Sequence, residues 1–368
     1  MAVPSTNIAW TIPASASAIS DLTKVSKDIP TPGPNQVLVK LNAATLNFRD
    51  ILVVTRSPQY PGDHKAGLVP GLDGAGIITS THTSSAWARK LGTKVILHPN
   101  NWLSGDISNL SVESTFGANS QDGTLQQYLV VDDEWVVPAP ASLNAVESAS
   151  LVTAGTTAWS AIREFLDGGL GGGLRAWEGS WTEKRLKGKT VLTMGTGGVS
   201  CFGIQIAAAL GATVIATSSS SRKLDIAKSL GATHVVNYVE TPEWDQEVLR
   251  LTGGKGVDHV IETGGSGTLM KSINATRPAG LISVLGILTP NAPLPAELVP
   301  NVLFSAKIVK GCMAFTRDSV AELAQFIQAN NIKPAIAQEF EFEQVIEAFE
   351  ALKKLNSVGK IVVKISDA

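Results

Sequence analysis

The sequence contains little cysteine, little net charge and no long apolar run. Cys201 and Cys312 are the two cysteines among 368 residues, too few for a disulfide framework or a cysteine-rich zinc cluster, which fits a reducing compartment. Because 30 basic residues nearly balance 32 acidic ones, neither nucleic acid nor an anionic membrane is expected as a partner. No stretch is long and apolar enough to span a bilayer, and the start lacks the basic and apolar regions of a secretory signal. These absences favour a cytoplasmic protein.

The length and composition predict a globular protein of two domains. A chain of 368 residues is too long for one ordinary hydrophobic core, and 44% of its residues are hydrophobic against 17% charged. Up to about residue 150, short apolar runs are broken by proline and glycine, which is typical of a β-rich domain. The strands expected there cover residues 36–41, 76–79, 94–97 and 125–131.

From about residue 151 the pattern changes to strands alternating with helices. After a helix over 145–161, the sequence predicts strands over 190–194, 213–217, 234–237, 258–262 and 281–285, with helices between them. Such alternation predicts an α/β fold with a doubly wound parallel sheet. The glycine-rich stretch 167–173 has no strand before it, so we expect a surface loop. The tail adds helices near 320–329 and 343–354 and a strand over 360–365.

A glycine turn joins the strand 190–194 to the next helix. Gly195, Gly197 and Gly198, with Thr196 and Val199, form this turn. Glycine has no Cβ, so the backbone can turn sharply and approach a pyrophosphate, and the free N–H groups of the following helix favour its charge. The turn therefore predicts a dinucleotide site. The alternative is a tight turn that holds no ligand.

The residues after the strand 213–217 indicate which dinucleotide is bound. An NAD site usually has Asp or Glu there for the ribose hydroxyl, but this chain has Ser218 and Ser219, followed by Arg222 and Lys223. A carboxylate would repel a 2′-phosphate, whereas hydroxyl groups and cations would bind it. NADPH is therefore the expected cofactor. The alternative is a solvated helix start, although cations at a helix N-terminus oppose its dipole.

Seven phrases together resemble the medium-chain dehydrogenase/reductase superfamily, in that family's order and over nearly the whole chain. They are LNFRD (46–50), VPGLDGAG (69–76), DGTLQQYLVV (122–131), TAGTTAW (153–159), GTGGVS (195–200), SLGATHVVNY (229–238) and SVGKIVV (357–363). The resemblance implies a GroES-like, β-rich substrate domain built from 1–150 and 318–368, and a Rossmann NADP-binding domain over 151–317. The active site would lie in the cleft between the two domains.

The metal ligands of the family's zinc enzymes are missing from this sequence. Asn47 stands where those members have a cysteine, and Leu72 before Asp73 stands where they have the histidine of a G-H-E phrase. No cysteine lies near 153–157, and the four-cysteine structural lobe is absent. Because zinc needs three N, S or O ligands, we expect no metal. The chain resembles the zinc-free quinone oxidoreductase and enoyl reductase branch.

That branch implies three catalytic candidates, Asn47, Tyr60 and Thr157. Asn47 could hold the substrate oxygen or the nicotinamide ribose, Tyr60 could donate a hydrogen bond or proton, and Thr157 would approach the nicotinamide. The alternatives are a turn residue after a strand, an aromatic loop residue, and a helix threonine bonded to its own backbone. For Arg49 and Asp50 we favour a structural ion pair or helix start.

Further residues are expected to contact the cofactor. Glu262, Thr263 and Gly264 end a parallel strand, at the edge where open α/β sheets bind ligands. Gly359 and Lys360 would close over the cofactor from the tail, although Lys360 could equally be a solvated strand lysine. The remaining members of this predicted set are Tyr238 and Gly286.

The function expected from these residues is NADPH-dependent reduction of an activated C=C bond, in an enone or quinone. Without a metal Lewis acid, hydride transfer to the β-carbon needs only hydrogen-bond donors for the developing enolate and a proton for the α-carbon. An NADP-dependent alcohol dehydrogenase or carbonyl reductase is an alternative, and a non-catalytic NADPH-binding structural or sensing protein is another. The partner would be a small electrophilic substrate. The resemblance also implies a homodimer, joined near 281–285 and the strand that follows.

Overall fold

The computed structural model describes residues 6–60, 62–168, 175–289 and 292–367. Internal contacts divide the chain into two compact units, the first comprising residues 1–154 with 316–368 and the second residues 155–315. The expected domain boundaries, after residues 150 and 317, fall close to these positions. None of the described helices is long and apolar enough to cross a membrane.

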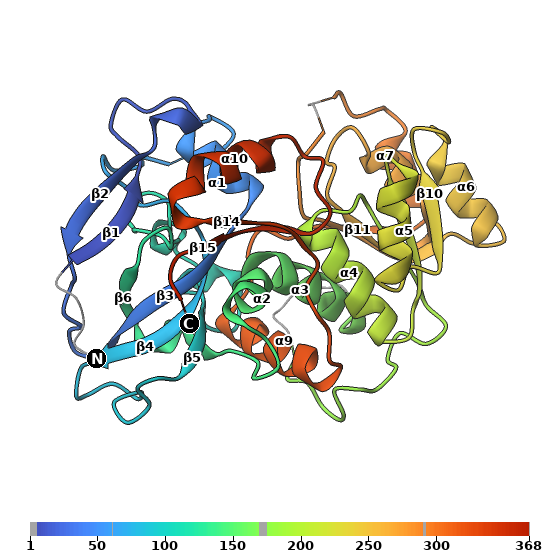
Figure 1. The fold of residues 1–368 in the computed structure, drawn as a ribbon. Coiled ribbons are helices and arrows are strands. Elements are labelled where there is room, and N and C mark those ends of the chain that lie inside the picture. Colours follow the sequence, from blue (N-terminus) through green and yellow to red (C-terminus); the bar gives the residue numbers. More distant parts are fainter. Residues whose placement is uncertain (1–5, 61, 169–174, 290–291, 368) are drawn as a thin grey trace. The chain divides into compact units, whose positions relative to one another are not determined.

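The first unit is built on a mainly antiparallel sheet whose strands come from both ends of the chain. Its order is β14-β15-β3-β4-β5-β7, with β6 also paired to β3. The C-terminal β15 lies antiparallel to β3, with Ile361 opposite Leu46. Figure 1 shows β15, from the red end of the chain, beside the blue β3. The strands are β3 (Gln36–Leu46), β4 (Asp73–Thr81), β5 (Lys94–Leu97), β6 (Tyr128–Asp132), β7 (Val136–Pro138), β14 (Ile336–Glu341) and β15 (Lys360–Lys364).

A hairpin, four α-helices and several short 3-10 helices complete the first unit among the described residues. The hairpin strands β1 (Thr6–Thr11) and β2 (Thr23–Asp28) pair with each other, and Ala9 of β1 also forms an isolated bridge with Gln126. The Trp10 indole Nε1 donates to the Phe342 carbonyl at 2.8 Å, which ties the hairpin to the tail. The α-helices are α1 (Phe48–Val54), α2 (Ala145–Ser150), α9 (Arg317–Ala329) and α10 (Val345–Lys353).

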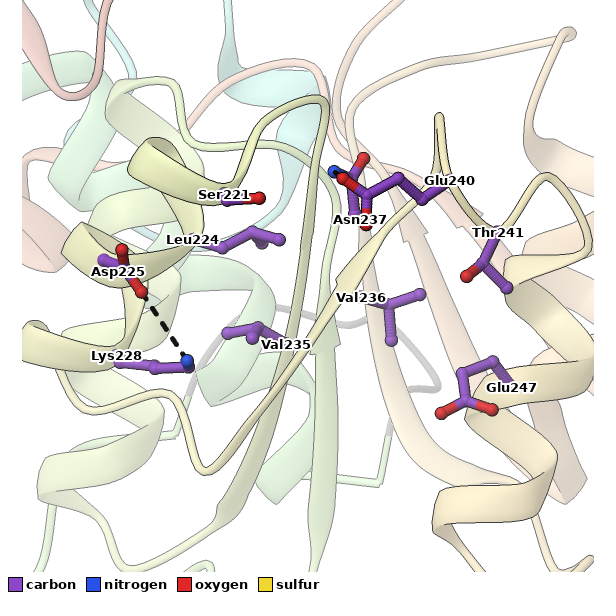
Figure 2. A pocket seen from close by; sticks show the side chains of 10 residues that line it. All are labelled: Ser221, Leu224, Asp225, Lys228, Val235, Val236, Asn237, Glu240, Thr241 and Glu247. Atoms are coloured by element: carbon purple, nitrogen blue, oxygen red, sulfur yellow. Dashed lines mark hydrogen bonds and ion pairs between the residues drawn. The ribbon is translucent and has the colours of Figure 1, made fainter.

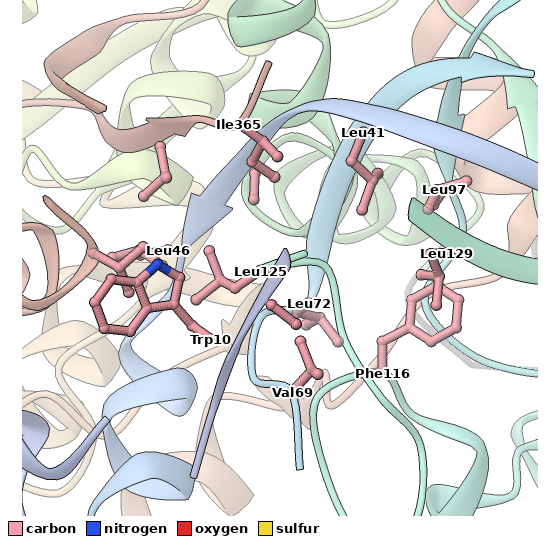
Figure 3. Packing of buried hydrophobic residues seen from close by; sticks show 14 of the residues in the cluster. Trp10, Leu41, Leu46, Val69, Leu72, Leu97, Phe116, Leu125, Leu129 and Ile365 are labelled. Atoms are coloured by element: carbon pink, nitrogen blue, oxygen red, sulfur yellow. The ribbon is translucent and has the colours of Figure 1, made fainter. Parts of the chain in front are cut away.

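The core of the first unit is apolar and includes a position of functional interest. Figure 3 shows Leu46, Leu72 and Leu125 among the packed side chains of this core. Leu72 is 7% exposed, so the residue just before Asp73 belongs to the core. Burial of such a side chain stabilises the fold by about 1.5–3 kcal/mol.

The second unit is a six-stranded parallel sheet of order β10-β9-β8-β11-β12-β13. The chain fills one half of the sheet from β8 to β10 and then the other half from β11 to β13, so the order reverses between β8 and β11. All six residues of β11 are buried, as expected for a parallel strand covered on both faces. The strands are β8 (Thr190–Thr193), β9 (Thr213–Ser218), β10 (His234–Asn237), β11 (Val257–Glu262), β12 (Thr276–Val284) and β13 (Ile308–Gly311).

Helices alternate with these strands, and the expected α/β fold class is confirmed. The crossover helices are α4 (Gly198–Ala209), α5 (Ser221–Ser229), α6 (Trp244–Leu251), α7 (Leu269–Ala275) and α8 (Leu298–Phe304). The expected helix over 145–161 consists of α2, a π-helical turn (Leu151–Gly155) and α3 (Thr156–Leu166). Most of the expected loop at 167–173 lies outside the described residues.

An aromatic cluster in the second unit is formed by three tryptophans. Trp177 stacks on Trp181 with ring centroids 5.1 Å apart and also packs against Trp159. The Arg185 guanidinium lies 3.9 Å from the Trp177 ring centroid, and the Arg163 guanidinium lies 5.1 Å from it. The segment that contains Trp177, Trp181 and Arg185 is therefore held to α3 by cation–π and stacking contacts.

Candidate functional site

Asn47 lies where β3 ends and α1 begins. Its backbone is extended, with φ −124°, and its N–H donates to the Asp50 carboxylate at 2.8 Å. The Asp50 N–H in turn donates to the Asn47 carbonyl at 2.9 Å. An Asn and an Asp three residues apart thus satisfy backbone groups at the helix start. These contacts hold the Asn47 backbone, and with it the Cα from which the side chain extends.

Asp73 is the centre of a buried polar cluster in the first unit. Its side chain has 0% exposed surface. One carboxylate oxygen accepts from Thr45 Oγ1 at 2.8 Å, from Asn47 Nδ2 at 3.0 Å and from Lys360 Nζ at 3.3 Å. The other accepts from the Thr153 backbone N–H at 3.1 Å and from its hydroxyl. A buried carboxylate requires hydrogen-bond donors at both of its oxygens, and Asp73 has them.

Lys360 is buried in this cluster, so the alternative of a solvated strand lysine is wrong. Its side chain is 4% exposed, and Nζ donates to the Leu46 carbonyl at 2.9 Å and to Asn47 Oδ1 at 2.7 Å, besides Asp73. The preceding Gly359 has φ +91°, and a Cβ there would lie 2.1 Å from the Ala335 carbonyl oxygen. Glycine is therefore required where β15 enters the sheet. That Lys360 and Gly359 contact the cofactor stays a prediction.

Arg49 connects Tyr60 to the same region. Its Nη2 donates to the Tyr60 hydroxyl at 2.9 Å, and its guanidinium lies 4.8 Å from the centroid of the Tyr60 ring. The expected ion pair is present, with Arg49 Nη1 3.0 Å from Asp50 Oδ1. Burial raises the pKa of Asp50, and the Arg49 charge opposes that shift. Because the Tyr60 oxygen accepts from Arg49, the phenolic proton is left to donate elsewhere.

The donor set around Asn47 does not fit a zinc ion. Leu72 is in the apolar core, and the Asn47 oxygen already accepts from the Lys360 ammonium. Across the described ranges, no group of three or more His, Cys, Asp or Glu residues is placed to hold a metal ion. Zinc needs three such ligands, and a protein ammonium beside the candidate ligand would repel it. Burial also raises the pKa of Cys312 to about 12, so its thiol is a poor ligand or nucleophile.

The glycine turn in the second unit has the form expected of a phosphate site. Gly195 has φ +74°, and a Cβ at Gly195 or Gly197 would meet nothing within 4 Å. No side chain caps α4 at Gly197. The turn is tied to the end of β9, because the Gly195 N–H donates to Thr217 Oγ1 at 3.3 Å and the Thr196 and Ser218 hydroxyls lie 3.2 Å apart. Open space before an uncapped helix N-terminus fits a pyrophosphate.

The basic residues beyond Ser218 lie at the start of α5. Among the described residues, neither Arg222 nor Lys223 forms a side-chain hydrogen bond or ion pair. Tyr238 is 40% exposed, and its backbone N–H donates to the Ser218 carbonyl at 3.1 Å. The structure thus places Tyr238 beside Ser218, in the same region as two unpaired cations. This region, together with Ser219, offers hydroxyl groups and cations to an anionic group.

The residues after β11 and β12 lie against each other. Glu262 is 0% exposed, and its carboxylate accepts from Gly264 N–H at 2.6 Å and from Thr268 Oγ1 at 2.7 Å. The Glu262 carboxylate therefore holds its own loop, and its contact with a cofactor stays a prediction. A Cβ at Gly286 would lie 2.5 Å from the Thr263 carbonyl oxygen. Thr263 Oγ1 donates to the Met194 carbonyl at 3.0 Å, beside the glycine turn.

A cavity of about 310 Å³ lies along β10, with lining residues from α5, β10 and α6, and it does not suit a phosphate. In Figure 2, Lys228 pairs with Asp225, while Glu240 and Glu247 bring further negative charge. We therefore assign no cofactor phosphate to it. It is lined by Ser221, Leu224, Asp225, Lys228, Val235, Val236, Asn237, Glu240, Thr241 and Glu247.

Thr157, the third catalytic candidate, lies half-buried on α3 in the second unit, and its role stays a prediction.

The sequence did not predict two contacts of the site, between Thr153 and Asp73 and between Arg49 and Tyr60. The phrases TAGTTAW and LNFRD contain Thr153 and Arg49, but no spacing within a phrase indicates contacts to residues 80 or 11 positions away.

Comparisons with known proteins agree with this architecture. The family model described as zinc-binding dehydrogenase matches residues 198–329, and that of the alcohol dehydrogenase GroES-like domain matches 33–141. A zinc-type alcohol dehydrogenase-like protein of Schizosaccharomyces pombe is 36% identical over 334 residues, covering 90% of this chain and 91% of its own. A 2-methylene-furan-3-one reductase of Solanum lycopersicum is 26% identical over 99% of this chain and 80% of its own.

Solved structures show the same relationship. An alcohol dehydrogenase-type chain from Sinorhizobium meliloti 1021 superposes with a TM-score of 0.85 at 32% identity, covering 99% of this chain and all of its own. These likenesses agree with the glycine turn and with the antiparallel sheet that the tail completes. The chain belongs to the medium-chain dehydrogenase/reductase superfamily, and it is an oxidoreductase of that family.

Proposed function

We propose that this oxidoreductase uses NADPH to reduce an electron-poor C=C bond, as in an enone or quinone, and that it does so without zinc. The observation that carries the proposal is the Lys360 ammonium, which lies 2.7 Å from Asn47 Oδ1 at the position where zinc relatives have a cysteine ligand. A chain that fills this place with its own cation has no strong Lewis acid for an alcohol or simple ketone.

The cluster offers hydrogen-bond donors, which suit conjugate reduction. NADPH, when bound, supplies the hydride. Asn47 is half-buried and uses one of its two amide hydrogens on Asp73, so the other can meet an enolate oxygen. Tyr60, polarised by the Arg49 guanidinium at 2.9 Å, can donate a hydrogen bond or a proton. We propose both as catalytic residues, with Thr157 near the nicotinamide.

The preference for NADPH is supported by the charge at the start of α5. Arg222 and Lys223 have no carboxylate partner among the described residues, and no carboxylate ends β9. Two unpaired cations at a helix N-terminus are unfavourable by themselves. A 2′-phosphate would remove that cost, whereas the hydroxyl of NADH would not.

Two other functions remain distinguishable by experiment. Carbonyl reduction is favoured by the alcohol dehydrogenase-like relative at 36% identity. A non-catalytic NADPH-binding role would keep the glycine turn but needs no donor at Asn47 or Tyr60.

A substrate panel with metal analysis tests the proposal. Purified protein is assayed by NADPH oxidation with enones, quinones, aldehydes and ketones, before and after chelation, and its zinc content is measured. We expect turnover of enones or quinones, unchanged by the chelator, and less than stoichiometric zinc. Turnover confined to aldehydes or ketones favours carbonyl reduction, and NADPH binding without turnover favours the non-catalytic role. Stoichiometric zinc that is needed for activity contradicts the proposal.

We also propose that the chain is a cytoplasmic homodimer joined along β13. Among the described strands, β13 pairs only with β12, so it is an edge, and Val309 on it is 39% exposed. The nearby Leu303 and Phe304 are 67% and 85% exposed, an apolar surface that a second copy would cover. Light scattering should give the mass of two chains, and Val309→Lys should give one, whereas Val239→Lys, also exposed on this unit, should leave the mass unchanged.

A further inference from the structure

The contacts of Asn47 determine how its amide is oriented. An ammonium has only hydrogens to donate, and a carboxylate has only oxygens that accept. Lys360 Nζ lies 2.7 Å from one end of the amide, and Asp73 Oδ2 lies 3.0 Å from the other. The end that faces Lys360 is therefore the oxygen, and the end that faces Asp73 is the nitrogen. The reversed amide would place N–H against ammonium and oxygen against carboxylate.

The Lys360 ammonium is also fixed by its contacts. Its three ammonium hydrogens are matched by three acceptors, the Leu46 carbonyl, Asn47 Oδ1 and Asp73 Oδ2. The side chain is 4% exposed and that of Asp73 is 0% exposed, so water cannot replace either partner. Two buried charges hold the amide between them, and turning it would leave both poorly satisfied.

We propose that Lys360 is a positioning residue, a resident cation that locks the Asn47 amide oxygen inward so that Asn47 offers a ligand only a hydrogen-bond donor. The pocket should then select ligands that present an acceptor oxygen, such as a conjugated carbonyl or a quinone, over ligands that need an acceptor for a hydroxyl hydrogen. This inference rests on the proposed function where it concerns substrate choice. The locking of the amide does not depend on that function.

A double-mutant cycle separates positioning from simple stabilisation. Lys360→Met leaves Asp73 buried without its cation, so we expect a thermal midpoint lower by roughly 5–10 °C. Adding Asp73→Asn removes the unpaired charge, and the double variant should recover at least half of that loss. The matched control is Lys364→Met on the same strand, where the lysine is 44% exposed and pairs with Glu339; it should change the midpoint by less than about 2 °C.

Activity should not follow stability in this cycle. In the double variant the amide is free to turn, so we expect kcat for an enone to stay at least about tenfold low, although the thermal midpoint has largely recovered. Lys360→Arg keeps a cation and should retain more kcat than the double variant. If kcat recovers together with the thermal midpoint, Lys360 is only structural and the proposal fails.

A spectroscopic readout keeps the test independent of turnover. With selective ¹⁵N-asparagine labelling, the side-chain amide of Asn47 is assigned by its disappearance in Asn47→Ala. We expect one sharp pair of amide signals in the original protein and in Lys360→Arg, and exchange-broadened or doubled signals in the double variant. An unchanged signal pair in the double variant overturns the proposal. If no acceptor is turned over while the signals behave as expected, the proposed function fails and the locked amide stands.

Discussion

Asp73 shows, at the scale of single residues, how a charge is tolerated in the core of this protein. Five donor groups reach its two oxygens, and Lys360 supplies the opposite charge. An unpaired buried carboxylate would destabilise the fold by several kcal/mol. The same contacts that make the charge tolerable also fix the groups around it, so stability and the geometry of Asn47 depend on one cluster.

Asn47→Asp tests the chemistry of that cluster directly. The substitution keeps the size of the side chain but puts a second carboxylate beside Asp73, with one ammonium to balance two charges. It also removes the N–H that we assign to the substrate oxygen. We expect kcat with an enone to fall by about 10²-fold or more and the thermal midpoint to fall as well. Asn47→Ala, which adds no charge, should lose kcat with a smaller change in the midpoint; a fully active Asn47→Asp enzyme would refute the donor role.

Lys223→Ala tests the choice of cofactor. Its ammonium would pair with the 2′-phosphate, a charge-assisted contact that contributes about 1.5–3 kcal/mol. We expect the calorimetric Kd for NADPH to rise by roughly 10- to 150-fold, with the Kd for NADH nearly unchanged. Lys228→Ala is the control, since Lys228 lies on the same helix and pairs with Asp225 at 3.6 Å. Equal weakening of both cofactors would show that Lys223 does not contact that phosphate.

At the scale of elements, the second unit brings its loops together because all its strands run parallel. The carboxyl ends of β8, β9, β11 and β12 share one edge, so the glycine turn, Ser218, Thr263 and Gly286 come from distant parts of the sequence to that edge. The reversal of strand order between β8 and β11 separates the two sets of crossovers. Loops at such an edge can hold an extended ligand.

Gly286→Ala tests how closely two of these loops must approach. A Cβ at this position would lie 2.5 Å from the Thr263 carbonyl oxygen, so the loop after β11 would have to move. We expect weaker NADPH binding by calorimetry and a free energy of unfolding lower by about 1–3 kcal/mol. Gly311→Ala, where a Cβ would meet nothing within 4 Å, should leave NADPH binding nearly unchanged. If the two variants behaved alike, close packing at Gly286 would not matter.

At the scale of the whole molecule, each unit carries a buried histidine that is neutral. Burial lowers the pKa of His98 in the first unit to about 3, and burial lowers the pKa of His259 in the second unit to about 3. His259 bonds to Ser283 at 2.9 Å and stacks on Phe165. Both units therefore contain a group that must gain a proton when the chain unfolds in mild acid.

The stability of both units should fall as the pH is lowered through this range. The unfolded pKa is near 6.5 and the folded pKa is about 3, so below pH 6.5 the unfolded chain binds protons that the folded chain does not. The contribution of the two histidines to the free energy of unfolding is fully present above pH 6.5. It should decline toward pH 3, by up to about 1.4 kcal/mol per pH unit for each histidine. Denaturant unfolding between pH 7 and 4.5 measures the slope. His259→Gln should reduce it, and an unchanged slope would contradict this assignment.

The parts of the fold that were predictable are those with local signals. The alternation of strands and helices in the second unit follows from apolar periodicity, and the glycine turn from three glycines in six residues. Other elements, several of them at edges, escaped prediction: the hairpin β1–β2, the strands β7 and β14, and the helix α8. They are short or mix polar with apolar residues, so their structure comes from packing against the rest of the unit.

By itself, the sequence determined the fold class, the cofactor turn, and the absence of cysteine and histidine from the family's zinc-ligand positions. Those properties depend on residue type and on neighbours in the chain. Only the tertiary structure decided that Lys360 is buried between Asn47 and Asp73 and that Arg49 contacts Tyr60. The reason is physical: β15 reaches β3 across more than three hundred residues, with Ile361 opposite Leu46, and only that register turns the lysine inward.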